Sequence, residues 1–272
     1  PFVLFSATSG QLAEKYDHAR LMRGVKNFEI VIMGIAAIGF ATHHVTVLLL
    51  CTFLMGLHST LFGPVKFAYL PRILQSHELT GGNGMVEMGT FVAILLGNVA
   101  GGLLVAMPEI GHTVVALACL LLALMGRWVS ARIPSLPASL PDVAINWNPF
   151  TEAKRNLQLA RTNPQVFHTL LGISWMWFFG AMFLSQFPSF AKAVLHGDAH
   201  VASLLLVLFS VGIGIGALMC ETLSRGRVEI GLVPLGAMGM SLFAVDLHVA
   251  SSQLAEAPLM NIATFLSDST HW

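Results

Sequence analysis

Four acidic or basic side chains within long apolar stretches are the first candidates for chemistry in this sequence. They are Lys66, Glu87, Glu29 and Asp246. An ionisable group at membrane depth costs about 2.5 to 3.5 kcal/mol on insertion scales, so it usually faces a cavity or a partner. Lys66 and Glu87 could therefore bind a ligand. The alternative is that both lie near helix ends, where they pair with each other or extend to the membrane surface.

The remaining ionisable groups in apolar stretches suggest structural roles. Glu29 follows Lys26 by three residues, and we expect it to be solvated or to brace the adjacent turn. Asp246 lies near the outer end of its stretch and has the same alternatives. His58 and His168 occur singly, and we expect hydrogen-bonded core residues, with proton carriage as the alternative.

Two charged turns interrupt the apolar sequence at related positions. The first is Gly10–Arg20, GQLAEKYDHAR, and the second is its looser echo Gly216–Arg227, GALMCETLSRGR. Such an echo is typical of internal repeats in membrane transporters. Ion pairs that break when two halves move could act as a latch, whereas bases alone would suffice to fix the topology. The predicted latch residues are Gly10, Glu14, Lys15, Asp17, Arg20, Glu221 and Arg225.

The elements that must position these residues are membrane-spanning helices. The composition is 55% hydrophobic and only 10% charged, and the mean hydropathy is +0.74. A spanning helix needs about 20 mainly apolar residues. The proline-containing stretch Arg132–Gln165 interrupts the pattern and predicts a linker with one amphipathic helix, Pro149–Ala160. The predicted spans are an incomplete one at Pro1–Leu12, then Leu21–Ala41, Val45–Leu70, Gly84–Met107, His112–Ala131, Val166–Phe190, Val201–Glu221 and Val228–Ala250.

The distribution of bases predicts the orientation of these spans. Of the 14 Lys and Arg residues, 13 fall on one side when alternate connections are counted, and only Lys192 falls on the other. Bases near span ends accumulate on the cytoplasmic side. The two charged turns and the linker are therefore predicted to be cytoplasmic.

Several classes of function are disfavoured. Cys51, Cys119 and Cys220 lie singly, without the spacing of a metal site or a disulfide framework. No Gly-Lys dipeptide occurs, which excludes a P-loop in this chain, and a formal net charge of zero gives no sign of nucleic-acid binding. Gly212-Ile-Gly214-Ile-Gly216 lies inside an apolar stretch and predicts close helix packing rather than a nucleotide loop. We expect no cofactor.

The first charged turn resembles a signature of the major facilitator superfamily. Gly10-Gln-Leu-Ala-Glu-Lys15 followed by Arg20 is similar to the cytoplasmic motif between the second and third helices of that family, with Asp17 where glycine is usual. The resemblance implies an all-α, twelve-helix transporter that works by rocking of two halves. We expect this chain to be a fragment, without the first and last helices. Its predicted parts are an N-terminal bundle at 1–131, a cytoplasmic linker at 132–165 and a C-terminal bundle at 166–272.

Further motifs resemble bacterial lysophospholipid transporters and the transporter domain fused to 2-acylglycerophosphoethanolamine acyltransferases. They are Phe62-Gly-Pro-Val-Lys-Phe67, Asn83-Gly-Met-Val-Glu87 and Ala93-Ile-Leu-Leu-Gly97. This resemblance implies a flippase in the bacterial inner membrane that moves lyso-phosphatidylethanolamine to the cytoplasmic leaflet for reacylation. It also implies membrane lipids and an acyltransferase or acyl-ACP synthetase as partners. The acyltransferase itself uses His and Asp separated by four residues, a spacing absent from this chain, so we expect no enzyme here.

A lysophospholipid requires an apolar slot with at least one base and one acid. Under this hypothesis Lys66 holds the phosphate and Glu87 the ammonium group, and Asn83 and Asp246 are further substrate-binding candidates. Two alternatives stay open: a major facilitator efflux pump for small amphipathic compounds, and a membrane fragment that transports nothing. In Gly97-Asn98-Val-Ala-Gly-Gly102, Asn98 replaces the proline that is usual in antiporters, which weakens the efflux alternative.

Overall fold

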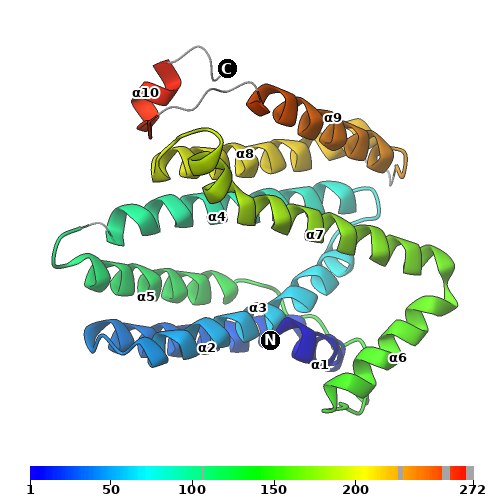
Figure 1. Cartoon of the computed structure of the whole chain (residues 1–272). Coiled ribbons are helices and arrows are strands. Elements are labelled where there is room, and N and C mark those ends of the chain that lie inside the picture. Colours follow the sequence, from blue (N-terminus) through cyan, green and yellow to red (C-terminus); the bar gives the residue numbers. More distant parts are fainter. Residues whose placement is uncertain (106, 226–228, 253–257, 268–272) are drawn as a thin grey trace. The chain divides into compact units, whose positions relative to one another are not determined.

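A computed structural model describes residues 1–105, 107–225, 229–252 and 258–267. Within these residues the chain is helical without strands, apart from an isolated bridge between Gly197 and Met260. Figure 1 labels the elements. They are α1 (Phe2–Lys15), α2 (His18–Ala41), α3 (Val45–Ile73), α4 (Leu79–Val105), α5 (Gly111–Ser130), α6 (Pro149–Thr162), α7 (Pro164–Ala193), α8 (Ala199–Ser224), α9 (Leu232–Ser252) and α10 (Ile262–Ser267).

Seven of the described helices are long and apolar enough to cross a membrane: α2, α3, α4, α5, α7, α8 and α9. They coincide with the seven complete spans predicted from the apolar stretches. The stretch predicted as an incomplete span, Pro1–Leu12, lies in the helix α1 of 14 residues, which is shorter than a bilayer requires. The amphipathic linker helix is also confirmed as α6, with Asn148 as its N-cap and Pro149 at its first turn.

The helices extend beyond the apolar stretches where capping or polar residues allow it. α4 begins at Leu79 instead of Gly84, and α7 continues to Ala193 through Pro188. A proline inside a spanning helix is tolerated when neighbouring groups satisfy the freed carbonyl. Apolar periodicity thus locates the membrane segments, whereas local backbone chemistry determines the exact ends of the helices.

The chain divides into two compact units. Unit 1 comprises Pro1–Leu74 and Ala100–Phe167, and unit 2 comprises Gln75–Val99 and His168–Trp272, the latter with the gaps given above. In unit 1, α2 packs between α3 and α5, while α1 packs against α3 and α6. α2 and α5 lie side by side in Figure 1 and run in opposite directions, since Arg127 near the end of α5 contacts Asn27 in the first half of α2, and Phe40 near the end of α2 contacts His112 at the start of α5.

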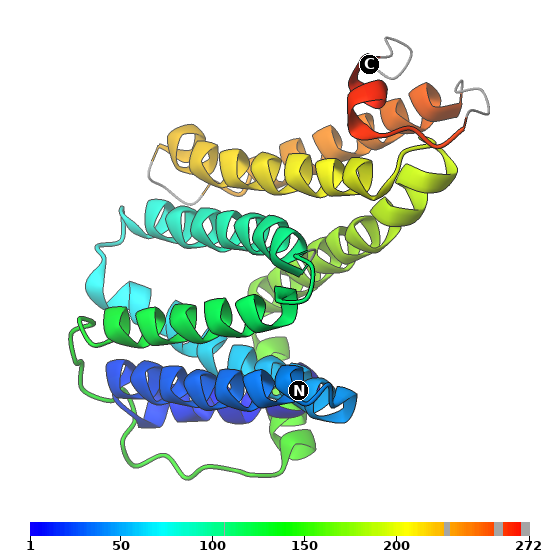
Figure 2. The same cartoon turned by 90° about the vertical axis from the view of Figure 1, so that its left-hand side faces the viewer.

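The loop between α5 and α6 covers one end of the unit 1 helices. A small core there contains Ala13, Met22, Val65 and Tyr69, and Ile133 and Leu136 of the loop pack against it. Figure 2 shows this loop as a green trace that runs around the blue helices. The loop is therefore attached to the bundle by apolar contacts.

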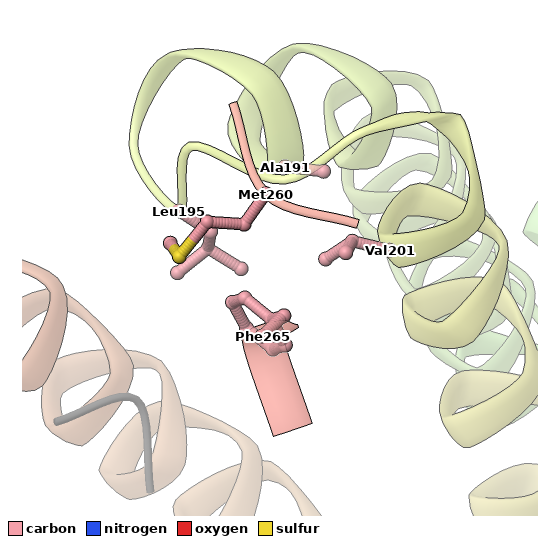
Figure 3. Packing of buried hydrophobic residues seen from close by; sticks show 5 residues of the cluster. All are labelled: Ala191, Leu195, Val201, Met260 and Phe265. Atoms are coloured by element: carbon pink, nitrogen blue, oxygen red, sulfur yellow. The ribbon is translucent and has the colours of Figure 1, made fainter. Parts of the chain in front are cut away.

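Unit 2 has its own apolar cluster where α7, α8 and α10 meet. Ala191, Leu195, Val201, Met260 and Phe265 point toward one another in Figure 3. The backbone supports this contact, since the Asp198 N–H donates to the Met260 carbonyl at 3.0 Å and the Met260 N–H donates to the His196 carbonyl at 2.7 Å. The segment before α10 is thus anchored to the turn between α7 and α8.

Candidate functional site

The four predicted substrate-binding residues lie on three helices. Lys66 is half-buried on α3 in unit 1, and its Nζ lies 4.6 Å from the centroid of the Phe67 ring. In unit 2, Glu87 is half-buried on α4, and Asn83 lies one turn earlier on the same face of that helix. Asp246 is exposed on α9. The structure thus brings Asn83 and Glu87 together and places Asp246 on a separate helix.

The half-burial of Lys66 and Glu87 decides what they can do. Both side chains lie within membrane-spanning helices, where an ionisable group needs a partner or an aqueous cavity. Lys66 has the Phe67 ring face as a neighbour, which attracts a cation while leaving the ammonium hydrogens free to donate to an anion. A base in this setting can bind phosphate as a point charge.

Asp17 in the first charged turn is the N-cap of α2. Its Oδ1 accepts hydrogen bonds from the backbone N–H groups of Ala19 at 2.8 Å and Arg20 at 3.1 Å. Burial tends to raise the pKa of this carboxyl, but the two backbone hydrogen bonds, one from Ser135 and the charge of Arg20 together lower it below its ordinary value. Asp17 is therefore an ionised cap that fixes the start of α2.

The neighbouring residues of this turn bind the loop between α5 and α6. Lys15 Nζ donates to the Val143 carbonyl at 2.8 Å, and the Glu14 carbonyl accepts from the Leu140 N–H at 2.9 Å. Among the described residues, the Glu14 carboxylate forms no ion pair with Lys15 or Arg20. Glu14 and Lys15 thus hold the loop between α5 and α6 in place, whereas no ion pair among the charges of this turn is seen in the described residues.

Gly10 and Arg20 are only weakly constrained by packing. Arg20 is exposed, and a side-chain carbon at Gly10 would meet nothing within 4 Å. Gly10 therefore has no packing contact that would require glycine in this arrangement. Arg20 contributes to this turn through its backbone N–H and its charge beside the Asp17 carboxyl.

The second charged turn makes a different contact. The Glu221 carboxylate of α8 lies against Gly81 of α4, so that a side-chain carbon at Gly81 would be 2.5 Å from Oε1. One turn further on, a side-chain carbon at Gly84 would be 2.8 Å from the Ala217 carbonyl oxygen. Arg225 is the C-cap of α8 in the left-handed conformation, with φ 51°. Arg227, the last residue of the predicted echo, lies outside the described residues.

Glu221 thus lies beside the first turn of α4, which begins at Leu79. The first backbone N–H groups of a helix have no partner within the helix and carry partial positive charge. A carboxylate at this position is electrostatically favourable. The predicted acid of the second latch is present, and its neighbour is a helix N-terminus.

Sequence reasoning missed a charged cluster inside unit 1. Glu29 was expected to be solvated or to brace a turn, yet its Oε2 lies 2.6 Å from Lys26 Nζ and 3.2 Å from His58 Nε2. The Lys26–Glu29 spacing of three residues is a signal for a pair on one helix face. His58 lies on another helix, and no sequence pattern indicates that it faces Glu29.

Comparison with known proteins places the chain in a family. The model of the Major Facilitator Superfamily matches residues 1–267. The chain belongs to the Major Facilitator Superfamily. Proteins named lysophospholipid transporter LplT from Escherichia coli (strain K12 / DH10B), Shigella sonnei (strain Ss046) and Shigella boydii serotype 4 (strain Sb227) are each 28% identical over 248 residues. No solved structure matches the chain.

These matches confirm the family and the helical membrane class that the motifs predicted. They cover 86% of this chain and 59% of each relative, so the chain spans about three fifths of the length of the curated relatives it matches. As a member of the Major Facilitator Superfamily with seven candidate spans in its described residues, it is a multi-pass membrane protein.

Proposed function

We propose that this chain forms part of a flippase that moves lysophospholipids of the lyso-phosphatidylethanolamine type to the cytoplasmic leaflet of a bacterial inner membrane. The similarity to proteins named lysophospholipid transporter over 86% of the chain carries this proposal. Transport proceeds by alternating access, as two helical halves rock around a site at membrane depth. The delivered lipid is then reacylated by an acyltransferase of the same or a neighbouring chain.

The chemistry of the substrate fits the half-buried charges. A lyso-phosphatidylethanolamine carries an anionic phosphate and an ammonium group, which require a base and an acid. Lys66 supplies the base, and the Phe67 ring beside its Nζ restricts where the Lys66 ammonium lies. Glu87 supplies the acid, and Asn83, on the same face of α4, can hydrogen bond to a headgroup oxygen. In this proposal Asp246 is a weaker substrate contact near the end of α9.

The charged turns act as conformational latches in this proposal. Within unit 1, Lys15 binds the loop that follows α5. Within unit 2, Glu221 lies against the first turn of α4. A contact of this kind that breaks in one of two arrangements biases the equilibrium between them. Both turns would then contribute to the rate of the conformational change rather than to substrate affinity.

The decisive experiment is uptake of labelled lyso-phosphatidylethanolamine by spheroplasts that lack their own carrier. The protein is expressed from its whole gene as wild type, Lys66→Ala and Glu87→Ala, after membrane insertion has been verified for each. Lys192→Ala and Glu229→Ala are matched controls, because both residues are exposed. We expect uptake to fall by at least about tenfold in the two site variants and to stay at the wild-type level in both controls.

Other outcomes would contradict the proposal at defined points. If inserted wild type takes up no lysophospholipid, the lipid function is wrong. Extrusion of small amphipathic dyes by the same cells would then favour an efflux pump. If wild type is active and both site variants are equally active, Lys66 and Glu87 are structural charges.

A further inference from the structure

Three ionisable side chains on two helices of unit 1 meet at one carboxylate. Glu29 Oε2 on α2 lies 2.6 Å from Lys26 Nζ of the same helix and 3.2 Å from His58 Nε2 on α3. Their side chains are 15%, 21% and 9% exposed, respectively. A carboxylate, an ammonium and an imidazole are thus removed from most of the solvent together.

The cluster lies near the middle of both helices. Counted from its first residue, Glu29 is the twelfth of 24 residues in α2, and His58 is the fourteenth of 29 in α3. At a rise of 1.5 Å per residue, Glu29 is about 16 Å from the start of α2. Both helices are long enough to span a hydrocarbon core about 30 Å thick, and the cluster lies away from both ends of each helix. Ionisable groups inside a spanning helix are costly and are by default candidates for function.

Both nitrogens of His58 lack a hydrogen bond among the described residues. The side chain is nine-tenths buried, and the contact of Nε2 with Glu29 has no hydrogen-bond geometry. The ring lies parallel to that of Phe62, with centroids 6.1 Å apart and 9° between the planes. An imidazole without partners next to a carboxylate is a position where a proton can be gained with little movement, because a small ring rotation aligns Nε2–H with Oε2.

The charges around the cluster define its two states. On α2, Lys26 and Glu29 cancel each other. On α5, the residue that faces Lys26 is Gly126, which adds no charge. A side-chain carbon at Gly126 would lie 3.1 Å from Lys26 Nζ. The next residue, Arg127, donates instead to Asn27 Oδ1 at 2.7 Å.

The other charges of α3 and α1 lie apart from the cluster. Further along α3, Lys66 lies over Phe67. On α1, the charges of Glu14 and Lys15 lie at the helix end beside the loop. With neutral His58 the cluster has no net charge, and one added proton makes it +1.

We propose that Glu29 and His58 form a proton-binding site inside the membrane, with Lys26 as its fixed positive charge. Proton binding converts the His58 imidazole to an imidazolium, whose N–H donates to Glu29 Oε2 and strengthens the contact between α2 and α3. No other bond is made or broken. Lys26 opposes this proton because it competes for the same carboxylate oxygen.

The first test measures protonation directly and does not depend on transport. The protein expressed from its whole gene is labelled with ¹⁵N-histidine in lipid nanodiscs, and the His58 signals are assigned from their loss in His58→Gln. We expect the wild-type ring to change protonation between pH 5 and 8. In Glu29→Gln the ratio of imidazolium to imidazole at a given pH falls about tenfold, and in Lys26→Met it rises, because an adjacent charge changes a titration by this order.

The opposite signs of these two changes separate a proton site from a structural ion pair. A purely structural cluster would lose stability in both variants and would leave the His58 ring in one protonation state throughout the range. That result overturns the proposal, as does a change of the same sign in both variants. His248→Gln, at an exposed position on α9, is the control, and it leaves the His58 signals unchanged.

A second test rests on the proposed transport function. Uptake of lyso-phosphatidylethanolamine is measured in proteoliposomes between pH 5 and 8 for wild type and His58→Gln. We expect the wild-type rate to change with pH and the variant rate to stay constant within about twofold. If no protein transports lipid while the His58 ring still titrates, the proposed function fails and the proton site stands. If transport occurs with the same pH profile in both proteins, the site does not regulate it.

Discussion

The two charged turns have similar sequences, yet their acids make different contacts. In the turn after α1, Asp17 directly precedes α2 and caps its first N–H groups. In the turn after α8, Glu221 lies within the last turn of its helix and contacts Gly81 of another helix. Position relative to the helix end explains the difference, because an acid that directly precedes a helix can accept from the free N–H groups at its start and an acid in the last turn cannot. Similar charge patterns therefore need not have the same mechanical role.

The bases of the two turns differ in the same way. Lys15 reaches a carbonyl of the loop after α5, so the first turn holds that loop to the bundle. Arg225 contributes its backbone as a left-handed C-cap of α8. The first turn therefore depends on hydrogen bonds to a loop, while the second depends on the close approach of α4 and α8 at two glycines. Substitutions can test each dependence separately.

The largest effect is expected at Gly84, where the close approach involves backbone. A side-chain carbon there would lie 2.8 Å from the Ala217 carbonyl oxygen, and α8 must move to relieve the overlap. We expect Gly84→Ala to reduce the free energy of unfolding by about 1 to 3 kcal/mol. Thermal unfolding in detergent measures this loss of stability. Gly89→Ala is the matched control on α4, because nothing lies within 4 Å of that position. Equal stability of the two variants would contradict the close approach.

The next effect concerns the capping acid of the first turn. Asp17→Ala removes the acceptor for the N–H groups of Ala19 and Arg20, and we expect a loss of about 1 kcal/mol in the free energy of unfolding. Asp17→Asn keeps an acceptor oxygen and loses less. An equal loss in both variants would mean that the charge of Asp17, rather than its cap, stabilises α2.

The same residue gives a dependence on pH with a defined sign. The pKa of Asp17 in the folded protein lies below its ordinary value of 3.8, chiefly because backbone hydrogen bonds outweigh the effect of burial. The stability from ionised Asp17 is therefore complete above about pH 5 and is lost as pH falls through the lowered pKa. Unfolding followed from pH 6 to pH 3 should show a smaller acid destabilisation in Asp17→Asn than in wild type. Parallel curves would contradict this.

These contacts also show how far sequence reasoning extends. Apolar stretches predicted the seven complete spans, and Asn148-Pro149 with its amphipathic pattern predicted α6, because these signals are local. The signature motif predicted the family for the same reason. The contact between Lys15 and Val143 was not predicted, since it joins residues 128 positions apart through a carbonyl that any residue could supply.

The candidate site was predictable only in part. A base and an acid inside apolar stretches identify Lys66 and Glu87 as residues that need an explanation. The packing of Glu29 against His58 required knowledge of which faces of α2 and α3 meet, and the sequence of each helix taken alone does not reveal this. Gly81 likewise gives no indication that a carboxylate occupies the space beside it.

A smaller effect is expected where the first turn holds the loop. Lys15→Met removes one donor to the Val143 carbonyl, and the loop should detach more often. A net hydrogen-bond contribution of about 1 kcal/mol corresponds to roughly fivefold faster cleavage by a protease within residues 131–148. Lys15→Arg retains a donor and should be cleaved at nearly the wild-type rate. Lys154→Met, at an exposed position on α6, controls for the loss of a cleavable lysine. If the loop of the Lys154→Met variant were also cleaved faster than that of wild type, the role assigned to Lys15 would be wrong.

The smallest effect is expected at Gly81, although its overlap is the shorter one. The atoms that a new side-chain carbon would meet at 2.5 Å belong to the Glu221 carboxylate, which can rotate away because Glu221 is exposed. Gly81→Ala should therefore cost less than about 1 kcal/mol, mainly through the lost interaction of the carboxylate with the start of α4. In a Glu221→Ala background the same substitution should cost nothing, and this double-mutant cycle isolates the contact. Additive effects would show that Gly81 and Glu221 act independently, and the acid of the second turn would then have no contact with α4 to set it apart from Asp17, which caps its own helix.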